Sequence, residues 1–185
     1  MHGSHARAGL VTGPGFSFRR LIVELALPMA ALAVSACGGP PKVVPFDLSF
    51  SSKDSAIEVF LTALAARDGA ALKTMVVGEA EFKKHIWPSL PASAPEVGMP
   101  LDYVWKDTAQ KNAGYLARLL DEHGGRHYQL VAASFAGDTS DYGAFLVHRE
   151  TTLDLRGPGG AATLRLFGSM VESGGRWKIY SFVVN

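Results

Sequence analysis

The chain has 185 residues, of which 48% are hydrophobic and 19% are charged, and its formal net charge is +1. A length of this order suits one domain with a buried core. The near-neutral charge and the absence of a lysine or arginine run exclude the basic surface that contacts with a phosphate backbone require, so no nucleic-acid partner is expected. The single cysteine excludes an internal disulfide, so stability must come from apolar burial.

The first 37 residues have the composition of an export signal. Arg19-Arg20 precedes an apolar run over residues 21–34, and the small residues of Ser35-Ala36-Cys37 follow it. A basic region, an apolar stretch and small residues in this order are typical of a secretory signal peptide. Glu24 and Pro28 interrupt the run, which therefore falls short of the roughly 18 apolar residues of a membrane-spanning helix.

The segment Val34-Ser35-Ala36-Cys37 resembles the lipobox of bacterial lipoproteins. In that family the signal is removed before the cysteine, whose sulfur receives a diacylglycerol. The resemblance implies a signal peptide over residues 1–36, lipid attachment at Cys37 and a membrane as partner. Gly38, in place of aspartate, implies release to the periplasmic face of the outer membrane. The alternative is an amphipathic or membrane-spanning start with an incidental cysteine.

Residues 37–50 are expected to form a flexible tether. The glycines and prolines of residues 38–45 disfavour a helix, because proline removes a backbone donor and glycine loses more conformational entropy on folding. One folded domain should then occupy residues 51–185.

Helices are predicted in the first half of this domain. The first should begin after Ser52, an N-cap candidate, and end near residues 67–69. Its apolar side chains recur on one helical face: Ile57, Phe60, Leu61 and Leu64. Shorter helices are predicted over residues 70–76 and 79–86, since the residue before Pro88 avoids the helical conformation.

The segment over residues 88–100 contains four prolines and is expected to be an irregular strap. A second long helix is predicted over residues 105–123, ended by a pair of glycines at residues 124–125. His123 at its end suits the negative end of the helix dipole.

Beyond residue 127 the apolar period changes from 3.6 to 2, which indicates strands. Four strands are expected, over residues 128–135, 143–155, 162–172 and 176–184. The short connections between them allow only antiparallel neighbours. The sequence thus predicts an α+β domain, with N-terminal helices packed on a curved antiparallel sheet of four or more strands.

Three segments resemble the NTF2-like (SnoaL-like) superfamily: residues 56–64, Arg67-Asp68-Gly69, and Gly175-Arg176-Trp177-Lys178-Ile179. The resemblance spans nearly the whole domain and implies a cone, in which the sheet wraps around a helix and leaves a pocket at its open end. The superfamily includes isomerases, dehydratases, cyclases and non-catalytic binding modules. It therefore implies a pocket without specifying a reaction.

Arg149 is the first candidate for a pocket residue. Strand periodicity places it on the same face as the apolar Val147 and Leu153, and a buried guanidinium requires a partner. Either a ligand anion or an internal carboxylate would satisfy it. We favour the internal pairing, for which the sequence offers Asp102, Asp107 and Glu122.

Aromatic side chains are a second indication of a pocket. Trp87, Tyr103 and Trp105 flank the proline-rich strap, and they either belong to the core or close the mouth of a cavity, as aromatic residues beside irregular backbone often do. Phe167 and Tyr180 lie in predicted strands and either line a pocket or form ordinary core, with core the favoured interpretation.

No metal site, cofactor or catalytic group is expected. His148 and Glu150 form a His-x-Glu pattern, but the chain lacks the paired cysteines that a zinc deaminase also uses. His123 and His127 have no third ligand nearby in sequence. An isomerase would require an aspartate base beside an oxyanion donor inside the cone, and no aspartate has the expected position.

We therefore expect a lipid-anchored, non-catalytic module that binds a small molecule or assembles with envelope components. The alternative is an NTF2-like isomerase or hydrolase acting on a small apolar or anionic substrate. A further alternative is a homodimer, or a structural part of an envelope complex, formed through the sheet.

Overall fold

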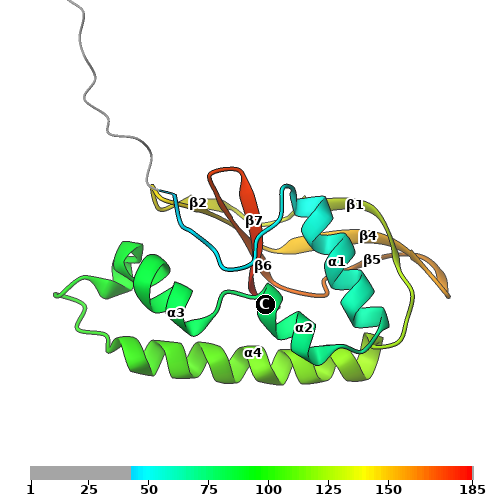
Figure 1. The fold of residues 1–185 in the computed structure, drawn as a ribbon, viewed down its shortest axis with the longest axis horizontal. Helices are drawn as coiled ribbons and strands as arrows, with labels where there is room; N and C mark the ends of the chain where they lie inside the picture. Colours follow the sequence, from blue (N-terminus) through cyan, green and yellow to red (C-terminus); the bar gives the residue numbers. More distant parts are fainter. Residues whose placement is uncertain (1–42, 185) are drawn as a thin grey trace, which may run out of the picture. The chain divides into compact units, whose positions relative to one another are not determined.

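The computed structural model describes residues 43–184. The predicted signal peptide, Cys37 and the first part of the predicted tether lie outside these residues. Within the described part, helices come first and strands last, so the domain is α+β as predicted (Figure 1). None of the described helices is both long and apolar enough to cross a membrane.

The first helix, α1 (Lys53–Ala65), forms where the apolar stripe and the cap predict it. The Ser52 hydroxyl accepts a hydrogen bond from the Ser55 N–H at 3.0 Å, and the Ser55 hydroxyl accepts one from the Ser52 N–H at 3.2 Å. This reciprocal cap satisfies two backbone donors. After α1 the chain turns through Arg67, whose φ is 55°, and α2 (Gly69–Met75) begins behind the capping carboxylate of Asp68.

The remaining helical segments follow the predicted order. Short turns lead from the predicted third helix into the strap: α3 (Glu79–Glu81), η1 (Phe82–Ile86), η2 (Trp87–Ser89) and η3 (Pro91–Ser93). The long helix α4 (Leu101–His123) begins earlier than predicted, directly after Pro100. Asp102 lies in its first turn, where a carboxylate interacts favourably with the helix dipole.

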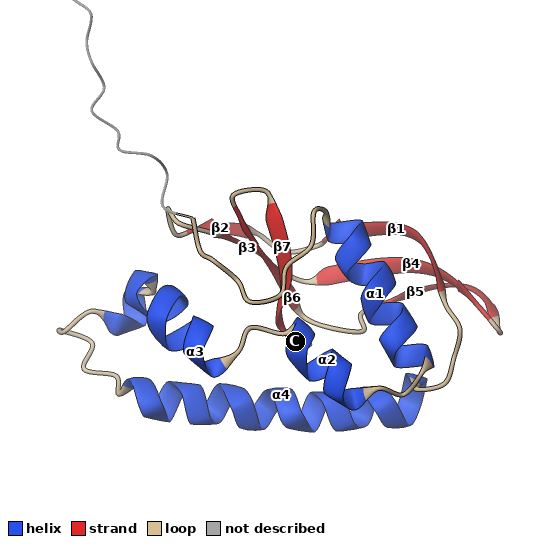
Figure 2. Ribbon diagram, in the orientation of Figure 1, coloured by secondary structure: helices blue, strands red, loops and turns tan. Residues whose placement is uncertain are grey.

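Within residues 43–184, seven short strands form two antiparallel sheets (Figure 2). One sheet has the order β1-β4-β5 and the other β2-β3-β6-β7. The strands are β1 (Gln129–Phe135), β2 (Thr139–Asp141), β3 (Leu146–His148), β4 (Thr151–Gly157), β5 (Gly160–Leu164), β6 (Ser169–Ser173) and β7 (Arg176–Ser181). The predicted second strand is thus divided into β3 and β4, and the third into β5 and β6.

These divisions are bends that join the two sheets. Glu150, between β3 and β4, has a φ of 58°, which a continuous strand cannot contain. Between β5 and β6 lies Gly168, where any Cβ would collide with the Val183 carbonyl oxygen. The Gly168 carbonyl accepts from Thr151 N–H at 2.8 Å and its N–H donates to Ser181 at 3.0 Å, so backbone pairing continues through the bend.

Two hydrophobic clusters hold the domain together. The central core packs α1 and α2 against the sheets, and in it the rings of Phe60 and Phe167 meet edge to face at 5.0 Å. The second cluster packs η1 against the four-stranded sheet and includes Phe82, Val147 and Val171. Together they bury the apolar positions that the sequence pattern identified.

Residues 43–50 belong to the folded domain, which corrects the predicted extent of the tether. Val44 is buried in the second cluster, and its N–H donates to the Ser173 hydroxyl at 2.8 Å. Phe50 and Trp177 exchange backbone hydrogen bonds of 2.8 and 2.9 Å. The composition of this segment disfavours a helix, as predicted. An extended segment can nevertheless pair with the free edge of β7, and composition alone does not reveal such pairing.

Candidate functional site

Arg149 is exposed, contrary to the predicted burial. It precedes Glu150 at the bend, where the backbone leaves the strand conformation, so strand alternation no longer directs its side chain inward. The carboxylates proposed as its partners interact elsewhere: Asp102 with Lys83 at 2.7 Å, Asp107 with Lys111 at 2.7 Å, and Glu122 with His123 at 4.0 Å. No buried ion pair therefore forms at this position.

Arg149 and Tyr180 nevertheless line one hollow of about 200 Å³, together with Glu150 and Tyr142. Burial raises the pKa of Tyr180 to about 12, and the opposing positive charge of Arg149 does not offset this. A tyrosine hydroxyl is protonated at neutral pH even without this shift, and it can donate a hydrogen bond. Glu150 lies 3.8 Å from the Arg165 guanidinium.

The remaining aromatic candidates are distributed over the domain. Phe167 is fully buried in the central core, and Tyr103 is 68% exposed, so neither closes a cavity. Trp87 packs against Phe82 with ring centroids 6.2 Å apart. Trp105 contacts the same phenylalanine at 5.4 Å and also lines a cavity beside α4.

This cavity, which we call the α4 slot, lies between α4 and the segment that joins α2 to α3. Its volume is about 280 Å³. Most of its lining is apolar, and its polar side chains are Lys73 and Asn112. The lining residues are Lys73, Val76, Val77, Gly78, Trp105, Ala109, Asn112, Ala113, Leu116 and Phe182. An apolar cavity with a few placed polar groups is the usual form of a small-molecule site.

Asn112 is the one polar lining residue of the slot that is buried, with 8% of its surface exposed. Its Oδ1 atom accepts hydrogen bonds from the Phe182 N–H at 2.8 Å and the Ser181 hydroxyl at 3.1 Å. The side chain therefore fixes the end of β7 to α4. Sequence analysis missed this residue, although its spacing of four and seven from the buried Leu116 and Leu119 places a polar residue on an apolar helical face.

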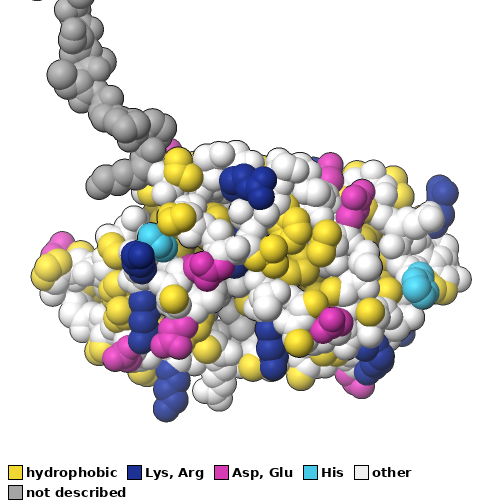
Figure 3. All heavy atoms as spheres, viewed as in Figure 1, with side chains coloured by type: hydrophobic (Ala, Val, Ile, Leu, Met, Phe, Trp, Pro, Cys, Tyr) yellow, Lys and Arg dark blue, Asp and Glu magenta, His cyan; other side chains and the backbone are white. Residues whose placement is uncertain are grey.

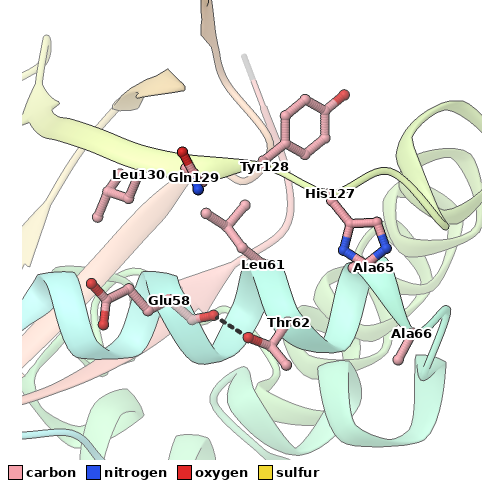
Figure 4. A pocket seen from close by; sticks show the side chains of 9 residues that line it. All are labelled: Glu58, Leu61, Thr62, Ala65, Ala66, His127, Tyr128, Gln129 and Leu130. Carbon is pink, nitrogen blue, oxygen red and sulfur yellow. Dashed lines mark hydrogen bonds between the residues drawn. The ribbon is translucent and has the colours of Figure 1, made fainter. Parts of the chain in front are cut away.

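A wider groove lies between α1 and the start of β1 (Figure 4). Its volume is about 560 Å³, and Leu61 points from α1 toward β1 in its middle. Its polar lining residues Glu58, His127 and Gln129 are all exposed. Water satisfies them without a ligand, so the groove presents less evidence of a binding site than the α4 slot.

The histidines considered as metal ligands have other contacts. His148 Nε2 lies 3.1 Å from Glu172, and its Nδ1 lies 3.0 Å from the Thr139 hydroxyl. His123 Nδ1 lies 2.9 Å from the Tyr128 hydroxyl, and burial lowers the pKa of this histidine. Among residues 43–184, no group of three or more His, Cys, Asp or Glu side chains is arranged to hold a metal ion.

Charges of both signs are intermingled over the face that carries α1 and α4 (Figure 3). Several basic side chains are paired with acidic ones, as Lys83 is with Glu79 and Asp102 at 3.0 and 2.7 Å. This distribution lacks the single-sign field that steers a highly charged ligand.

Comparisons with known proteins add no relative: no family model, no curated protein and no solved structure matches this chain. The α4 slot, with its apolar walls and buried amide, is therefore the feature on which a functional assignment depends.

Proposed function

We propose that the chain is an exported, lipid-anchored module that binds a small apolar ligand in the α4 slot and does not transform it. The observation that carries this proposal is the slot itself, an apolar cavity that contains one buried amide. The titratable side chain in its lining is Lys73, which is exposed. Binding is supported by the apolar walls, and catalysis would need an acid–base pair that this lining lacks.

The anchor is proposed from the sequence. The basic pair, the apolar run and Ser35-Ala36-Cys37 have the order of a lipoprotein signal. Val43, the first described residue, is six positions after Cys37 and adjoins the buried Val44. Six residues span at most about 20 Å when extended. A lipid on Cys37 would therefore hold the domain, and its slot, close to the bilayer surface.

We further propose that the fold is of the NTF2-like kind. Supporting features are the helices that precede the strands, the antiparallel pairing and the bends at Glu150 and Gly168, which curve the strands. Two of the segments that carry the resemblance form α1 and β7, the first helix and the last strand of the described residues, which supports this proposal.

An isomerase or hydrolase is the second candidate, and one observation favours it. Tyr180, whose pKa burial raises to about 12, shares a hollow with Glu150 and Arg149. A phenol that donates to a developing oxyanion beside a carboxylate base is a known arrangement for isomerisation. In this alternative, Tyr180→Phe would abolish turnover of a small anionic substrate while leaving ligand binding in the α4 slot unchanged.

The ligand proposal is tested by native mass spectrometry of the purified full chain. We expect a retained small molecule, which Ala109→Leu should displace because Ala109 lines the slot. Ala117→Leu is the matched control, since Ala117 is an exposed residue of the same helix outside the slot lining. Equal retention of the molecule by both variants would show that the slot is not the binding site.

The anchor proposal is tested separately by Cys37→Ser. This change removes the sulfur that would carry the diacylglycerol, so the variant should lose its membrane association or remain uncleaved. Fractionation and mass determination of the N-terminus provide the measurement. A processed Cys37→Ser chain that stays in the membrane fraction would refute lipid attachment.

A further inference from the structure

The orientation of the Asn112 amide is determined by its neighbours. The Phe182 backbone N–H can only donate, and it lies 2.8 Å from Asn112. The amide oxygen must therefore face residues 181–182, where it also accepts from the Ser181 hydroxyl. The NH2 group is consequently directed away from the end of β7. The donors around the amide therefore determine which of its two ends is the oxygen.

The NH2 group is left without a protein acceptor. Within residues 43–184 the Asn112 side chain makes its hydrogen bonds through Oδ1, and none is donated from Nδ2. More than nine-tenths of the residue is buried, and the cavity that it lines is the α4 slot. An amide NH2 group that lines an apolar cavity, and that donates no hydrogen bond within the described residues, can donate to an acceptor that enters the cavity.

We propose that the ligand of the α4 slot is an apolar molecule bearing a neutral carbonyl oxygen, and that Asn112 Nδ2 donates to that oxygen. This inference rests on the proposed function. Val76, Val77, Leu116 and the Trp105 ring contact the apolar body of the ligand. Asn112 thereby determines specificity, because a ligand without an acceptor leaves the amide unpaired.

A neutral carbonyl fits the slot better than a carboxylate. A buried carboxylate needs several donors or a paired cation to offset the loss of hydration. The slot offers the Asn112 amide in its interior, whereas the cationic Lys73 is exposed. A single amide donor is sufficient for a ketone, ester or amide oxygen and insufficient for a charged group.

The inference is tested with three probes of matched shape: 2-nonanone, 2-methyl-1-nonene and nonanoate. Their binding to the purified full chain is followed by the fluorescence of Trp105, with Trp105→Phe identifying its contribution. We expect the ketone to bind about 2- to 10-fold more tightly than the alkene, as one net hydrogen bond provides. Nonanoate should bind more weakly than the ketone. Equal ketone and alkene affinities, or tightest binding of nonanoate, would overturn the inference.

The variant Asn112→Asp tests whether the NH2 group of Asn112 is the donor to the ligand. Aspartate keeps an oxygen for the Phe182 N–H and removes the NH2 group, so the preference for ketone over alkene should disappear. The NH2 signals of Asn112 in the unaltered protein give a second measurement that needs no variant. They should shift on addition of 2-nonanone and remain in place with the alkene. A preference that survives Asn112→Asp, or NH2 signals that do not respond to the ketone, would refute the role of Asn112.

The same binding measurements distinguish a wrong ligand class from a wrong location of the binding site. If Ala109→Leu removes the binding of ketone and alkene and their affinities are equal, the slot is the site and the carbonyl class is wrong. If Ala109→Leu leaves both affinities at the level of the Ala117→Leu control, the slot is not the site and both proposals are wrong. Circular dichroism of each variant confirms that it is folded.

Discussion

Each face of the four-stranded sheet carries a pair formed by a basic residue and a carboxylate. The two pairs differ in their exposure to water. Trp177 and Lys178 are neighbours on β7, so strand alternation directs them to opposite faces. On one face, Lys178 meets Glu81 in the interior. On the other, His148 meets Glu172 beside the Trp177 ring, where the carboxylate is a quarter exposed.

The Lys178–Glu81 pair is almost fully enclosed. The Nζ–Oε1 distance is 2.9 Å, and the two side chains are 2% and 4% exposed. Glu81 also accepts from the backbone N–H groups of Gly78 and Asp47, each at 2.8 Å. These donors make the buried carboxylate tolerable. They also connect α3 and the N-terminal segment to β7 through one side chain.

The His148–Glu172 pair is held mainly by aromatic contacts. The imidazole stacks on Phe135 at 4.7 Å and on Trp177 at 4.8 Å. The partners of its two ring nitrogens, Thr139 and Glu172, lie near water at the sheet surface. The two distances are similar, so we expect enclosure, rather than the distance between charges, to determine how much each pair contributes to stability.

The largest effect should come from removing Glu81. In Glu81→Ala the buried Lys178 ammonium and two backbone N–H groups lose their acceptor, which should cost about 3 to 5 kcal/mol of unfolding free energy. Urea unfolding at neutral pH provides the measurement. Lys178→Met should be less damaging, because Glu81 would retain its two backbone donors. The reverse order would contradict the role assigned to Glu81.

A smaller loss is expected on the other face. Trp177→Ala removes a half-buried ring that contacts both Phe135 and His148, and should cost about 2 to 3 kcal/mol, below the range for a fully buried tryptophan. Trp177→Phe retains a stacking ring and should recover part of the loss. A melting temperature unchanged by Trp177→Ala would show that the stack contributes nothing to stability.

The smallest effect is expected at an exposed pair of similar geometry. Lys111 and Asp107 on α4 are 2.7 Å apart, with side chains 57% and 47% exposed. Water and salt screen such a pair, so Asp107→Ala should leave the melting temperature within experimental error. A loss comparable to that of Glu81→Ala would mean that enclosure does not govern the contribution of these pairs.

Part of the candidate site was accessible from the sequence. Arg149, the first pocket candidate of the sequence, lines one hollow with Tyr180, for which core is the favoured sequence interpretation, and Trp105 lines the α4 slot. The sequence pattern does not indicate Asn112, Lys73 or residues 76–78 as slot residues. They come from parts of the chain that become neighbours only when α4 packs beside α2, and no local periodicity encodes that contact.

The sequence by itself determined the elements whose causes are local. The Ser52 cap and the apolar stripe specify α1, the glycines at residues 124–125 follow the end of α4, and period-two alternation indicates antiparallel strands. Tertiary structure decided the rest. The Gly168 backbone approaches Val183, and Phe50, which precedes α1, pairs with Trp177 of β7. These features depend on which distant segments meet, because burial and backbone pairing are satisfied across the whole fold and not within a window of neighbouring residues.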